Sequence, residues 1–304
     1  MTDHGIKRVA IVGAGTMGAQ IGSLIAIHGY PVAITDAIPD ALDRARLRID
    51  EQILPELHRS GIGTLDPAEA RTNLRFEPDL ESAIANADLV IEAVREDVDV
   101  KTELFGRMDA INPTAILASN SSSIPTRNVI DKVTRSERIM NMHFFAPIWV
   151  RTMVELMTCG QTDESVLQRA QAFSQEIGLV APIVRIESKG FIINRIWRAV
   201  KRESLRVMDE GVASPEDIDR LWMIFFQTEY APFGVMDMVG LDVVRDIEWS
   251  YQRDTVDPTD KPSPGLAKMI DEGKFGEKSG QGFYAHPNPA YQQPGFIPKR
   301  QKEE

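Results

Sequence analysis

The sequence predicts an α/β protein with an N-terminal doubly wound sheet and a C-terminal all-helical domain. Short β-branched runs alternate with helical patterns up to residue 187, as expected for a parallel sheet covered by helices on both faces. Beyond that point every periodic segment is helical. The chain has 304 residues, a length that favours about two domains. We therefore expect domains at residues 1–187 and 188–304.

The chain opens with a strand, a helix and a second strand. Residues 8–12 (RVAIV) form a compact β-branched run that ends on glycine, which is typical of a strand buried on both faces. Small and apolar residues dominate positions 17–29 and predict a helix. Residues 31–36 (PVAITD) predict a strand that ends on an acid, with a proline at its start where no ladder donor is lost. Together these segments have the length of a βαβ unit.

The alternation continues through the rest of the N-terminal half. Residues 39–58 predict a long charged helix that Pro55 kinks or ends. Helices are also expected at residues 98–110 and 164–177. Further β-branched runs predict strands at residues 87–93, 114–119, 138–144, 153–157 and 180–186.

The C-terminal half lacks a convincing strand pattern. Helices are expected over residues 192–210, 215–226, 235–251 and 265–272. Four arginines fall near one face of the first of these helices, where ion pairs within or between subunits are expected. They are Arg195, Arg198, Arg202 and Arg206. The last twenty residues are rich in Pro, Gln, Lys and Glu and predict an irregular tail.

Composition and charge exclude several classes of protein. The 45 acidic and 34 basic residues give a net charge of −11, which argues against nucleic acid and membranes as partners. A single cysteine, Cys159, can form neither an intrachain disulfide nor a thiolate cluster for a structural metal. The apolar stretch at residues 9–27 is interrupted by glycines and by Gln20, so it is a poor signal peptide or membrane span. We expect a cytoplasmic protein without a bound metal.

A glycine-rich turn follows the first predicted strand. Residues 13–18 (GAGTMG) match the G-x-G-x-x-G pattern at the point where strand and helix meet. Gly13 permits a tight turn, Gly15 lets the backbone approach a pyrophosphate, and Gly18 lets the helix pack closely against the strand. The motif in this context predicts a Rossmann-type, dinucleotide-binding domain. A glycine turn that binds nothing is the alternative.

An acid at the end of the second strand selects the cofactor. Asp36 lies 18 residues beyond Gly18, where its carboxylate can accept hydrogen bonds from both ribose hydroxyls of an adenosine. The same carboxylate repels a 2′-phosphate, and Ala37 and Ile38 offer no arginine to receive one. We therefore predict NAD rather than NADP as the cofactor.

Polar residues gather at the ends of predicted strands. They lie in the segments 119–123 (SNSSS), 141–147 (NMHFFAP) and 154–156 (VEL), and another group opens the helical half at 190–195 (GFIINR). In open α/β sheets, ligands bind beyond the carboxyl ends of the strands. An imidazole can take the hydroxyl proton of an alcohol that is being oxidised, and His143 is the best candidate among five histidines. The alternative for His143 is a histidine whose hydrogen bonds are satisfied in the core.

Eight segments together resemble a known family across nearly the whole chain. They are GAGTMG, SNSSS, HFFAP, VEL, GFIINR, GVASPEDID, PFGVMDMVGLD and FGEKSGQGFY. The chain resembles the L-3-hydroxyacyl-CoA dehydrogenase family, including the bacterial 3-hydroxybutyryl-CoA dehydrogenases. The resemblance implies an oxidoreductase of fatty acid metabolism that uses NAD to convert an L-3-hydroxyacyl-CoA, for example 3-hydroxybutyryl-CoA, into the 3-ketoacyl-CoA. It also implies a homodimer formed through the helical domain, for which the candidate apolar residues are Phe225, Phe226, Met236, Met238 and Val239.

The resemblance further implies roles for single residues. His143 is the general base and acid, oriented by Glu155. Ser122 and Asn194 bond the substrate oxygen. Together with the residues discussed above, the expected cofactor contacts are Gly13, Gly15, Thr16, Met17, Gly18, Asp36, Glu96, Lys101, Asn120, Ser122 and Lys278.

Plainer alternatives exist for several of these residues. Glu96 and Lys101 would otherwise be a solvated ion pair near a helix start, and Lys278 a solvated lysine. Ser122 would otherwise cap a helix, and Asn194 would be a polar residue at a helix start. Basic residues on the long charged helix are the local candidates for the phosphates of CoA. They are Arg44, Arg48 and Arg59.

Two departures from the family pattern concern the substrate. The family has HFFNP where this chain has HFFAP, so Ala146 lacks the asparagine side chain that contacts the cofactor end. Residues 226–231 (FQTEYA) replace the glycine-rich, proline-containing loop that precedes the family's GPFE segment. Nicotinamide positioning and acyl chain length therefore stay open.

Two other functions also stay open. A dehydrogenase of a free 3-hydroxy acid, of the gulonate or carnitine type, would share the fold and the acid–base chemistry but would not use CoA. A non-enzymatic NAD-binding protein, like the lens crystallins related to this fold, would share the fold alone. The 6-phosphogluconate-like class fits poorly, because Lys189 precedes Gly190 instead of following a glycine-rich stretch.

Overall fold

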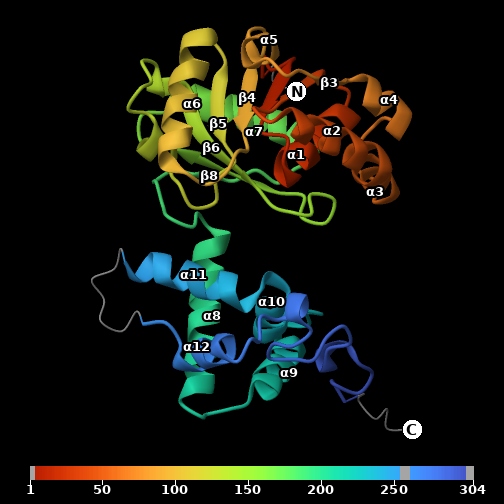
Figure 1. The fold of residues 1–304 in the computed structure, drawn as a ribbon, viewed down its shortest axis with the longest axis vertical. Coiled ribbons are helices and arrows are strands. Elements are labelled where there is room, and N and C mark those ends of the chain that lie inside the picture. Colours follow the sequence, from red (N-terminus) through yellow and green to blue (C-terminus); the bar gives the residue numbers. More distant parts are fainter. Residues whose placement is uncertain (1–3, 254–260, 299–304) are drawn as a thin grey trace. The chain divides into compact units, whose positions relative to one another are not determined.

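The computed structural model describes residues 4–253 and 261–298 of the chain. The chain forms two units, Met1–Ile193 and Asn194–Glu304 (Figure 1). The first contains a sheet flanked by helices and the second is helical, which confirms the predicted fold class. The boundary expected between residues 187 and 188 remains a prediction.

The sheet of the first unit places the glycine motif, which follows β1, near its middle. Within the described residues the strand order is β3-β2-β1-β4-β5-β6-β7-β8. The strands are β1 (Val9–Val12), β2 (Val32–Thr35), β3 (Leu74–Phe76), β4 (Leu89–Glu92), β5 (Ile116–Ser119), β6 (Ile139–Phe144), β7 (Val154–Thr158) and β8 (Ile183–Val184). Neighbouring strands are parallel except β6 and β7, which are antiparallel. The strand order reverses between β1 and β4, so a ligand crevice is expected at their carboxyl ends.

Helices flank this sheet (Figure 1). They are α1 (Thr16–Ile27), α2 (Pro39–Arg48), α3 (Leu54–Arg59), α4 (Pro67–Thr72), α5 (Leu80–Ile84), α6 (Val98–Ile111) and α7 (Glu164–Glu176), with 3-10 turns at Thr126–Val129 and Ser136–Arg138. Side chains alternate between the two faces of a strand, so Val9 and Ile11 join one apolar core, and Ala10 and Val12 join the other. Residues of α1 and α7 complete the first core, and residues of α6 complete the second. Burial on both faces explains the continuous apolar runs of the strands.

The helix predicted at residues 39–58 is interrupted in the structure. A π-helical turn, Ile49–Ile53, joins α2 to α3, and Pro55 lies in the first turn of α3. Because proline has no N–H, the regular hydrogen-bond ladder cannot pass through it unchanged. The widened turn directly before Pro55 accommodates the missing donor. The expected interruption is therefore confirmed, and it takes the form of a π-helical turn.

Some elements have little signal in the sequence. The structure places α4, β3 and α5 within residues 63–86, where no clear period is present. β3 has only three residues and lies at the edge of the sheet. The carboxylates of Asp66 and Asp79 cap α4 and α5 by accepting hydrogen bonds from backbone N–H groups. At the opposite edge, β8 has two residues, fewer than the predicted strand at 180–186.

The second unit is built from helices. They are α8 (Ile193–Asp209), α9 (Pro215–Phe226), α10 (Pro232–Val239), α11 (Leu241–Gln252) and α12 (Pro264–Asp271), with 3-10 turns at Glu277–Ser279 and Ala290–Gln292. The prediction of one helix over residues 235–251 is wrong, because the chain breaks at Gly240 between α10 and α11. Gly240 has φ +99°, a conformation that ends a helix and that favours glycine.

Two buried carboxylates tie the second unit together. Asp219 of α9 accepts hydrogen bonds from the N–H groups of Phe233 and Gly234, at 2.9 and 3.0 Å, and from the Tyr284 hydroxyl at 2.9 Å. Asp237 of α10 accepts from the N–H groups of Phe283 and Tyr284, at 2.9 and 2.8 Å. These bonds connect α9, α10 and the segment after α12. They fix that segment although it has little regular structure.

The C-terminal end is irregular as far as the structure describes it. Residues 285–298 hold one short 3-10 turn, and residues 299–304 of the expected tail lie outside the described residues. Across the two described ranges, no helix is both long enough and apolar enough to cross a bilayer.

Candidate active site

The glycine motif forms the turn between β1 and α1. Gly13 has φ +111°, and a Cβ there would lie 2.6 Å from the carbonyl oxygen of Ala93. A Cβ on Gly18 would lie 1.8 Å from the carbonyl oxygen of Gly13. Both positions therefore need glycine for the chain's own packing. A Cβ on Gly15 would meet no atom within 4 Å, so the space beside it is open to a ligand.

The start of α1 fits the pyrophosphate of a dinucleotide. Gly15 is the N-cap residue, and no side chain caps the helix. Backbone N–H groups and the helix dipole at such an end favour an anion. Asp36, just after β2, accepts hydrogen bonds from the N–H of Ala14 at 2.7 Å and of Ile38 at 2.9 Å. Each of its carboxylate oxygens retains capacity for a further donor such as a ribose hydroxyl.

A pocket of about 520 Å³ opens at the carboxyl ends of β4, β5 and β6. Its lining residues are Thr16, Met17, Ala93, Val94, Arg95, Glu96, Lys101, Asn120, Ser121, Ser122, His143, Phe144, Phe145 and Ala146. The structure thus brings together seven of the predicted site residues, namely Thr16, Met17, Glu96, Lys101, Asn120, Ser122 and His143. The pocket also includes Ala146, which replaces the family asparagine.

His143 and Glu155 face each other across two strands. The antiparallel register of β6 and β7 pairs these two residues directly. Nδ1 of His143 lies 3.0 Å from Oε2 of Glu155, and both side chains are buried. The other oxygen of Glu155, Oε1, accepts hydrogen bonds from the N–H groups of Ile192 and Ile193, each at 2.9 Å. The carboxylate is therefore held from both sides, and it fixes the orientation of the imidazole.

Two aromatic rings flank the imidazole. The ring centroids of Phe145 and Phe191 lie 4.2 and 4.8 Å from that of His143. Phe191 has φ +54°, which turns the chain just before α8. Sequence reasoning missed the contribution of these rings and of the two backbone donors to Glu155. The GFIINR segment contains the signal, because it supplies Phe191 and both donors.

A polar network lies behind the serine loop. Glu96 Oε1 accepts hydrogen bonds from the Ser121 hydroxyl at 2.7 Å and from the Ser122 N–H at 3.2 Å. Lys101 is buried rather than solvated, and its Nζ lies 3.4 Å from Glu96 and 2.5 Å from Glu92. The alternative of a solvated pair is therefore wrong for Lys101, whereas Glu96 is exposed. The side chain of Asn120 accepts from the N–H of Phe144 at 2.9 Å, so it joins β5 to β6.

Two predicted site residues belong to the second unit. Asn194 is the residue after Ile193, whose N–H bonds to Glu155. Lys278 forms an ion pair with Asp242 of α11.

Several of the predicted basic residues have local partners. Arg48 donates to the Thr16 hydroxyl at 3.0 Å, and Arg59 pairs with Glu56 at 2.6 Å. Arg198 pairs with Glu248 of α11 at 3.0 Å, and Arg206 with Glu203 at 3.2 Å. The expected ion pairing along α8 is thus present within the unit. No group of three or more His, Cys, Asp or Glu side chains in the described ranges is arranged to hold a metal.

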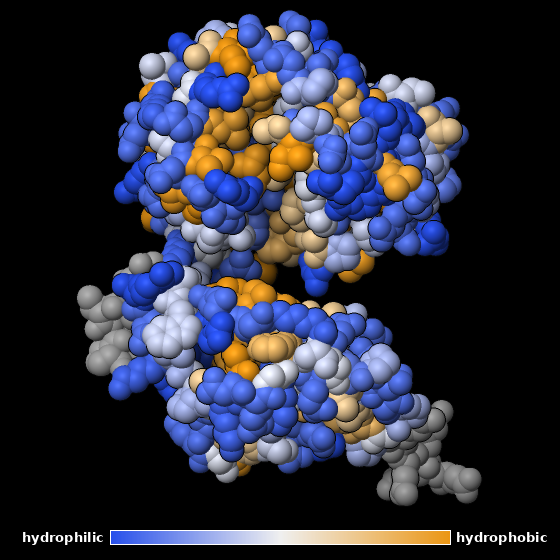
Figure 2. All heavy atoms as spheres, viewed as in Figure 1, coloured by the Kyte–Doolittle hydropathy of each residue, from blue (hydrophilic) through white to orange (hydrophobic). Residues whose placement is uncertain are grey.

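Apolar side chains are exposed on the second unit (Figure 2). Phe225 is 80% and Phe226 is 53% exposed, and Met238 and Val239 are also exposed. Met236 is fully buried, so the expectation that it lies on this surface is wrong. It packs into the unit's own core with Phe233 and Leu241.

Two family models match the chain. One, described as the NAD binding domain of 3-hydroxyacyl-CoA dehydrogenase, matches residues 8–187. The other, described as the C-terminal domain of 3-hydroxyacyl-CoA dehydrogenase, matches residues 190–286. Together they cover both halves of the chain.

Known proteins of similar sequence and structure match most of this chain. Human mitochondrial hydroxyacyl-coenzyme A dehydrogenase is 32% identical over 288 residues, which are 92% of this chain and 91% of the human protein. The 5-formyl-3-hydroxy-2-methylpyridine 4-carboxylate 5-dehydrogenase of Mesorhizobium japonicum is 30% identical over 287 residues, with coverage of 92% and 91%. A solved (S)-3-hydroxybutyryl-CoA dehydrogenase from Ralstonia eutropha has a TM-score of 0.85 and 30% identity, with coverage of 93% and 99%.

Proposed function

The chain belongs to the 3-hydroxyacyl-CoA dehydrogenase family, and we propose that it oxidises an L-3-hydroxyacyl-CoA to the 3-ketoacyl-CoA with NAD. The observation that carries this proposal is the pair formed by His143 and Glu155 beside the pocket of the NAD-binding domain. A dehydrogenase needs a group that accepts the hydroxyl proton next to its cofactor, and this pair meets that need.

His143 takes the hydroxyl proton of the substrate. Glu155 accepts the hydrogen bond of Nδ1, so Nδ1 carries the ring proton and Nε2 presents a lone pair. Proton uptake at Nε2 makes the ring cationic, and the carboxylate of Glu155 stabilises that charge. Phe145 and Phe191 limit the access of water to the ring. In the reverse direction His143 returns the proton to the oxygen at C3.

Ser122 and Asn194 bond the oxygen at C3. Ser122 lines the same pocket as His143, and Asn194 directly follows a backbone donor to Glu155. A hydroxyl and an amide can each donate to an oxygen that gains negative charge as its proton leaves. Aligned donors of this kind favour the transition state over the bound substrate.

The NAD-binding domain holds the cofactor at the glycine turn. When bound, NAD supplies the hydride acceptor, its nicotinamide ring. We assign the pyrophosphate to the N–H groups at the start of α1, beginning with Gly15, and the adenosine ribose to Asp36. Gly13 shapes the turn, because its own N–H donates to the Thr35 carbonyl at 2.8 Å. The remaining contacts are assigned to Thr16, Met17, Glu96, Lys101, Asn120, Ser122 and Lys278.

The proposal also covers the contacts to the acyl carrier and to a second subunit. Cations on α2 and α3 are the candidates for the phosphates of CoA, and they are Arg44, Arg48 and Arg59. We assign a homodimer contact to the exposed apolar residues of α9 and α10, Phe225, Phe226, Met238 and Val239.

A second candidate substrate is a free carboxylic acid. The relative from Mesorhizobium japonicum is named for a pyridine carboxylate, a substrate without CoA. Ala146 in the pocket wall is also smaller than the family asparagine. Both observations favour testing acids beside thioesters.

The consumption of NADH, followed by its absorbance, tests the proposal. Acetoacetyl-CoA, a longer 3-ketoacyl-CoA and free acetoacetate are offered separately to the protein. We expect rapid consumption with the thioesters only, and the preferred chain length then defines the acyl site. Turnover of free acetoacetate at an equal rate would favour the free-acid alternative. NADH binding without any turnover, here and with other free acids, would favour a non-enzymatic NAD-binding protein.

A further inference from the structure

A closed set of polar contacts extends from the pocket wall to the strand ends behind it. Nζ of Lys101 contacts Glu92 Oε1 at 2.5 Å and Glu96 Oε2 at 3.4 Å. Glu96 Oε1 accepts from the Ser121 hydroxyl at 2.7 Å, and the Ser121 N–H donates to the Ser119 hydroxyl oxygen at 3.2 Å. The Ser119 hydroxyl donates to Glu92 Oε2 at 2.6 Å, which closes the circuit. We call Glu92, Lys101, Glu96, Ser121 and Ser119 the Glu92 ring.

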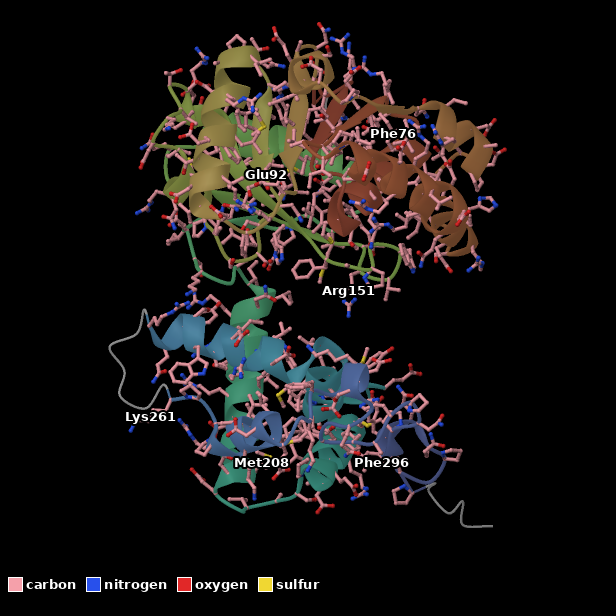
Figure 3. All side chains as sticks on the ribbon, in the orientation of Figure 1. Phe76, Glu92, Arg151, Met208, Lys261 and Phe296 are labelled. Atoms are coloured by element: carbon pink, nitrogen blue, oxygen red, sulfur yellow. The ribbon has the colours of Figure 1, made fainter. Side chains whose placement is uncertain are left out.

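The ring joins three elements. Glu92 ends β4, Ser119 ends β5 and Lys101 lies in the first half of α6. Glu92 is fully buried and accepts a further hydrogen bond from the N–H of Val94 at 2.7 Å. Figure 3 shows Glu92 within the first unit, among the strands of the sheet and the helices that flank it. Its two oxygens thus hold the strand ends and the helix in one arrangement.

Two members of the ring do not touch the pocket. Lys101, Glu96 and Ser121 line the pocket, but Glu92 and Ser119 are absent from its wall. A buried lysine and glutamate are costly to desolvate, and an apolar pair of similar size often stabilises a fold as well or better. Stability alone is therefore a weak reason for this pair. A role in placing the pocket groups explains it better.

We propose that Glu92 is a positioning residue of the dehydrogenase reaction. Through Lys101 it fixes the ammonium and the carboxylate of Glu96 at the pocket wall. Through Ser119 and Ser121 it fixes the serine loop, whose Ser122 N–H also donates to Glu96. The buried carboxylate of Glu92 thereby fixes the position of the cofactor contacts, Lys101 and Glu96, relative to Ser122, the ligand of the substrate oxygen. The inference rests on the proposed function for the role of Ser122.

Four variants of the full chain test this role. Glu92→Gln removes the buried charge and keeps the side-chain shape. Ser119→Ala opens the ring and leaves every charge paired. Glu103→Gln removes an exposed glutamate of α6 that pairs with Lys132, and Ser174→Ala removes a buried serine hydroxyl of α7 that bonds to a backbone carbonyl. The last two are the matched controls.

The readouts are the Kd for NADH from its fluorescence, kcat and KM with acetoacetyl-CoA, and the melting temperature. All binding and rate measurements are made where circular dichroism shows each variant folded. We expect Glu92→Gln to raise the NADH Kd about tenfold and to lower kcat about tenfold, because small misplacements near reacting groups are costly. Ser119→Ala is expected to change the NADH Kd and kcat in the same directions by about threefold. Both controls keep Kd and kcat within about twofold, even where the melting temperature falls.

The opposite result overturns the proposal. If folded Glu92→Gln binds and turns over like the wild type, Glu92 serves stability alone. If Glu92→Gln does not fold, Ser119→Ala decides by the same two quantities. If the wild type uses no thioester, the proposed function fails, and the NADH Kd of Glu92→Gln and Ser119→Ala still tests the placement of the cofactor contacts.

Discussion

At His143, the hydrogen bond between Nδ1 and Glu155 leaves Nε2 as the nitrogen available to a substrate. The tautomer of His143 also depends on residues beyond Glu155. The N–H groups of Ile192 and Ile193 donate to Oε1 of Glu155 and so hold the carboxylate in place. With glutamate or glutamine at position 155, a side-chain oxygen faces these two N–H donors. The other terminal atom faces His143 and is an oxygen in glutamate and a nitrogen in glutamine. That atom determines which nitrogen of His143 carries the ring proton.

The substitution Glu155→Gln tests this reasoning. Its amide oxygen stays with the two backbone donors, so its NH2 group faces Nδ1 of His143 and moves the ring proton to Nε2. That tautomer cannot accept the hydroxyl proton, and we expect kcat to fall about a hundredfold or more with little change in the NADH Kd. Steady-state kinetics and NADH fluorescence measure the two quantities. Glu164→Gln, on the exposed side of α7, is the control and keeps wild-type kinetics. Unchanged kcat in Glu155→Gln would show that the tautomer is not set in this way.

At the scale of elements, the turn between β1 and α1 contains glycines of two kinds. A methyl group on Gly18 would overlap the carbonyl of Gly13, whereas one on Gly15 would enter open space. We expect Gly18→Ala to lower the melting temperature of the apo protein strongly. Gly15→Ala keeps the apo melting temperature but weakens NADH binding about tenfold or more, because the methyl group takes space meant for the pyrophosphate. Differential scanning fluorimetry and NADH fluorescence separate the two effects. Tight NADH binding by Gly15→Ala would remove the pyrophosphate from this turn.

A pH dependence is expected for the helical unit. Burial raises the pKa of Asp219 from its ordinary value of 3.8 to about 6, against the hydrogen bonds from Phe233, Tyr284 and Gly234 that lower it. Between pH values of about 4 and about 6, Asp219 is protonated in the folded state and ionised in the unfolded state. The unfolding free energy therefore falls as the pH rises through this range. Asp219 contributes about 3 kcal/mol to that fall. In Asp219→Asn this part of the slope disappears. Tryptophan fluorescence during unfolding measures it, since Trp197, Trp222 and Trp249 lie in this unit. An equal slope in both proteins would contradict the raised pKa.

The sequence could predict most elements but not every contact. The strands β1, β2, β4, β5 and β6 follow from apolar runs that a parallel sheet buries on both faces. β3 has no such signal, because a three-residue edge strand has few buried positions. Gly240 was compatible with a continuous helical pattern, and its positive φ depends on packing that the pattern does not contain. Similarly, Glu92 is a single acid at the end of an apolar strand, and only the tertiary structure pairs it with Lys101 and Ser119.

At the scale of the whole molecule, the exposed apolar side chains of α9 and α10 predict a second copy of the chain as their partner. We expect light scattering to give the mass of two chains. Phe225→Asp places a charge at an 80% exposed position and shifts the mass to one chain, with an unchanged circular dichroism spectrum. Val180→Asp, at an exposed position in the first unit, keeps the mass of the wild type. A wild-type protein with the mass of one chain would refute the dimer.

The central claim is that His143 transfers a proton to and from an acyl-CoA substrate next to bound NAD. The most direct test compares NADH oxidation with acetoacetyl-CoA in the wild type and in His143→Ala, with the NADH Kd measured for both. We predict fast oxidation by the wild type, a loss of about a hundredfold or more in kcat for His143→Ala, and equal NADH binding. A variant that oxidises NADH as fast as the wild type would remove His143 from the mechanism.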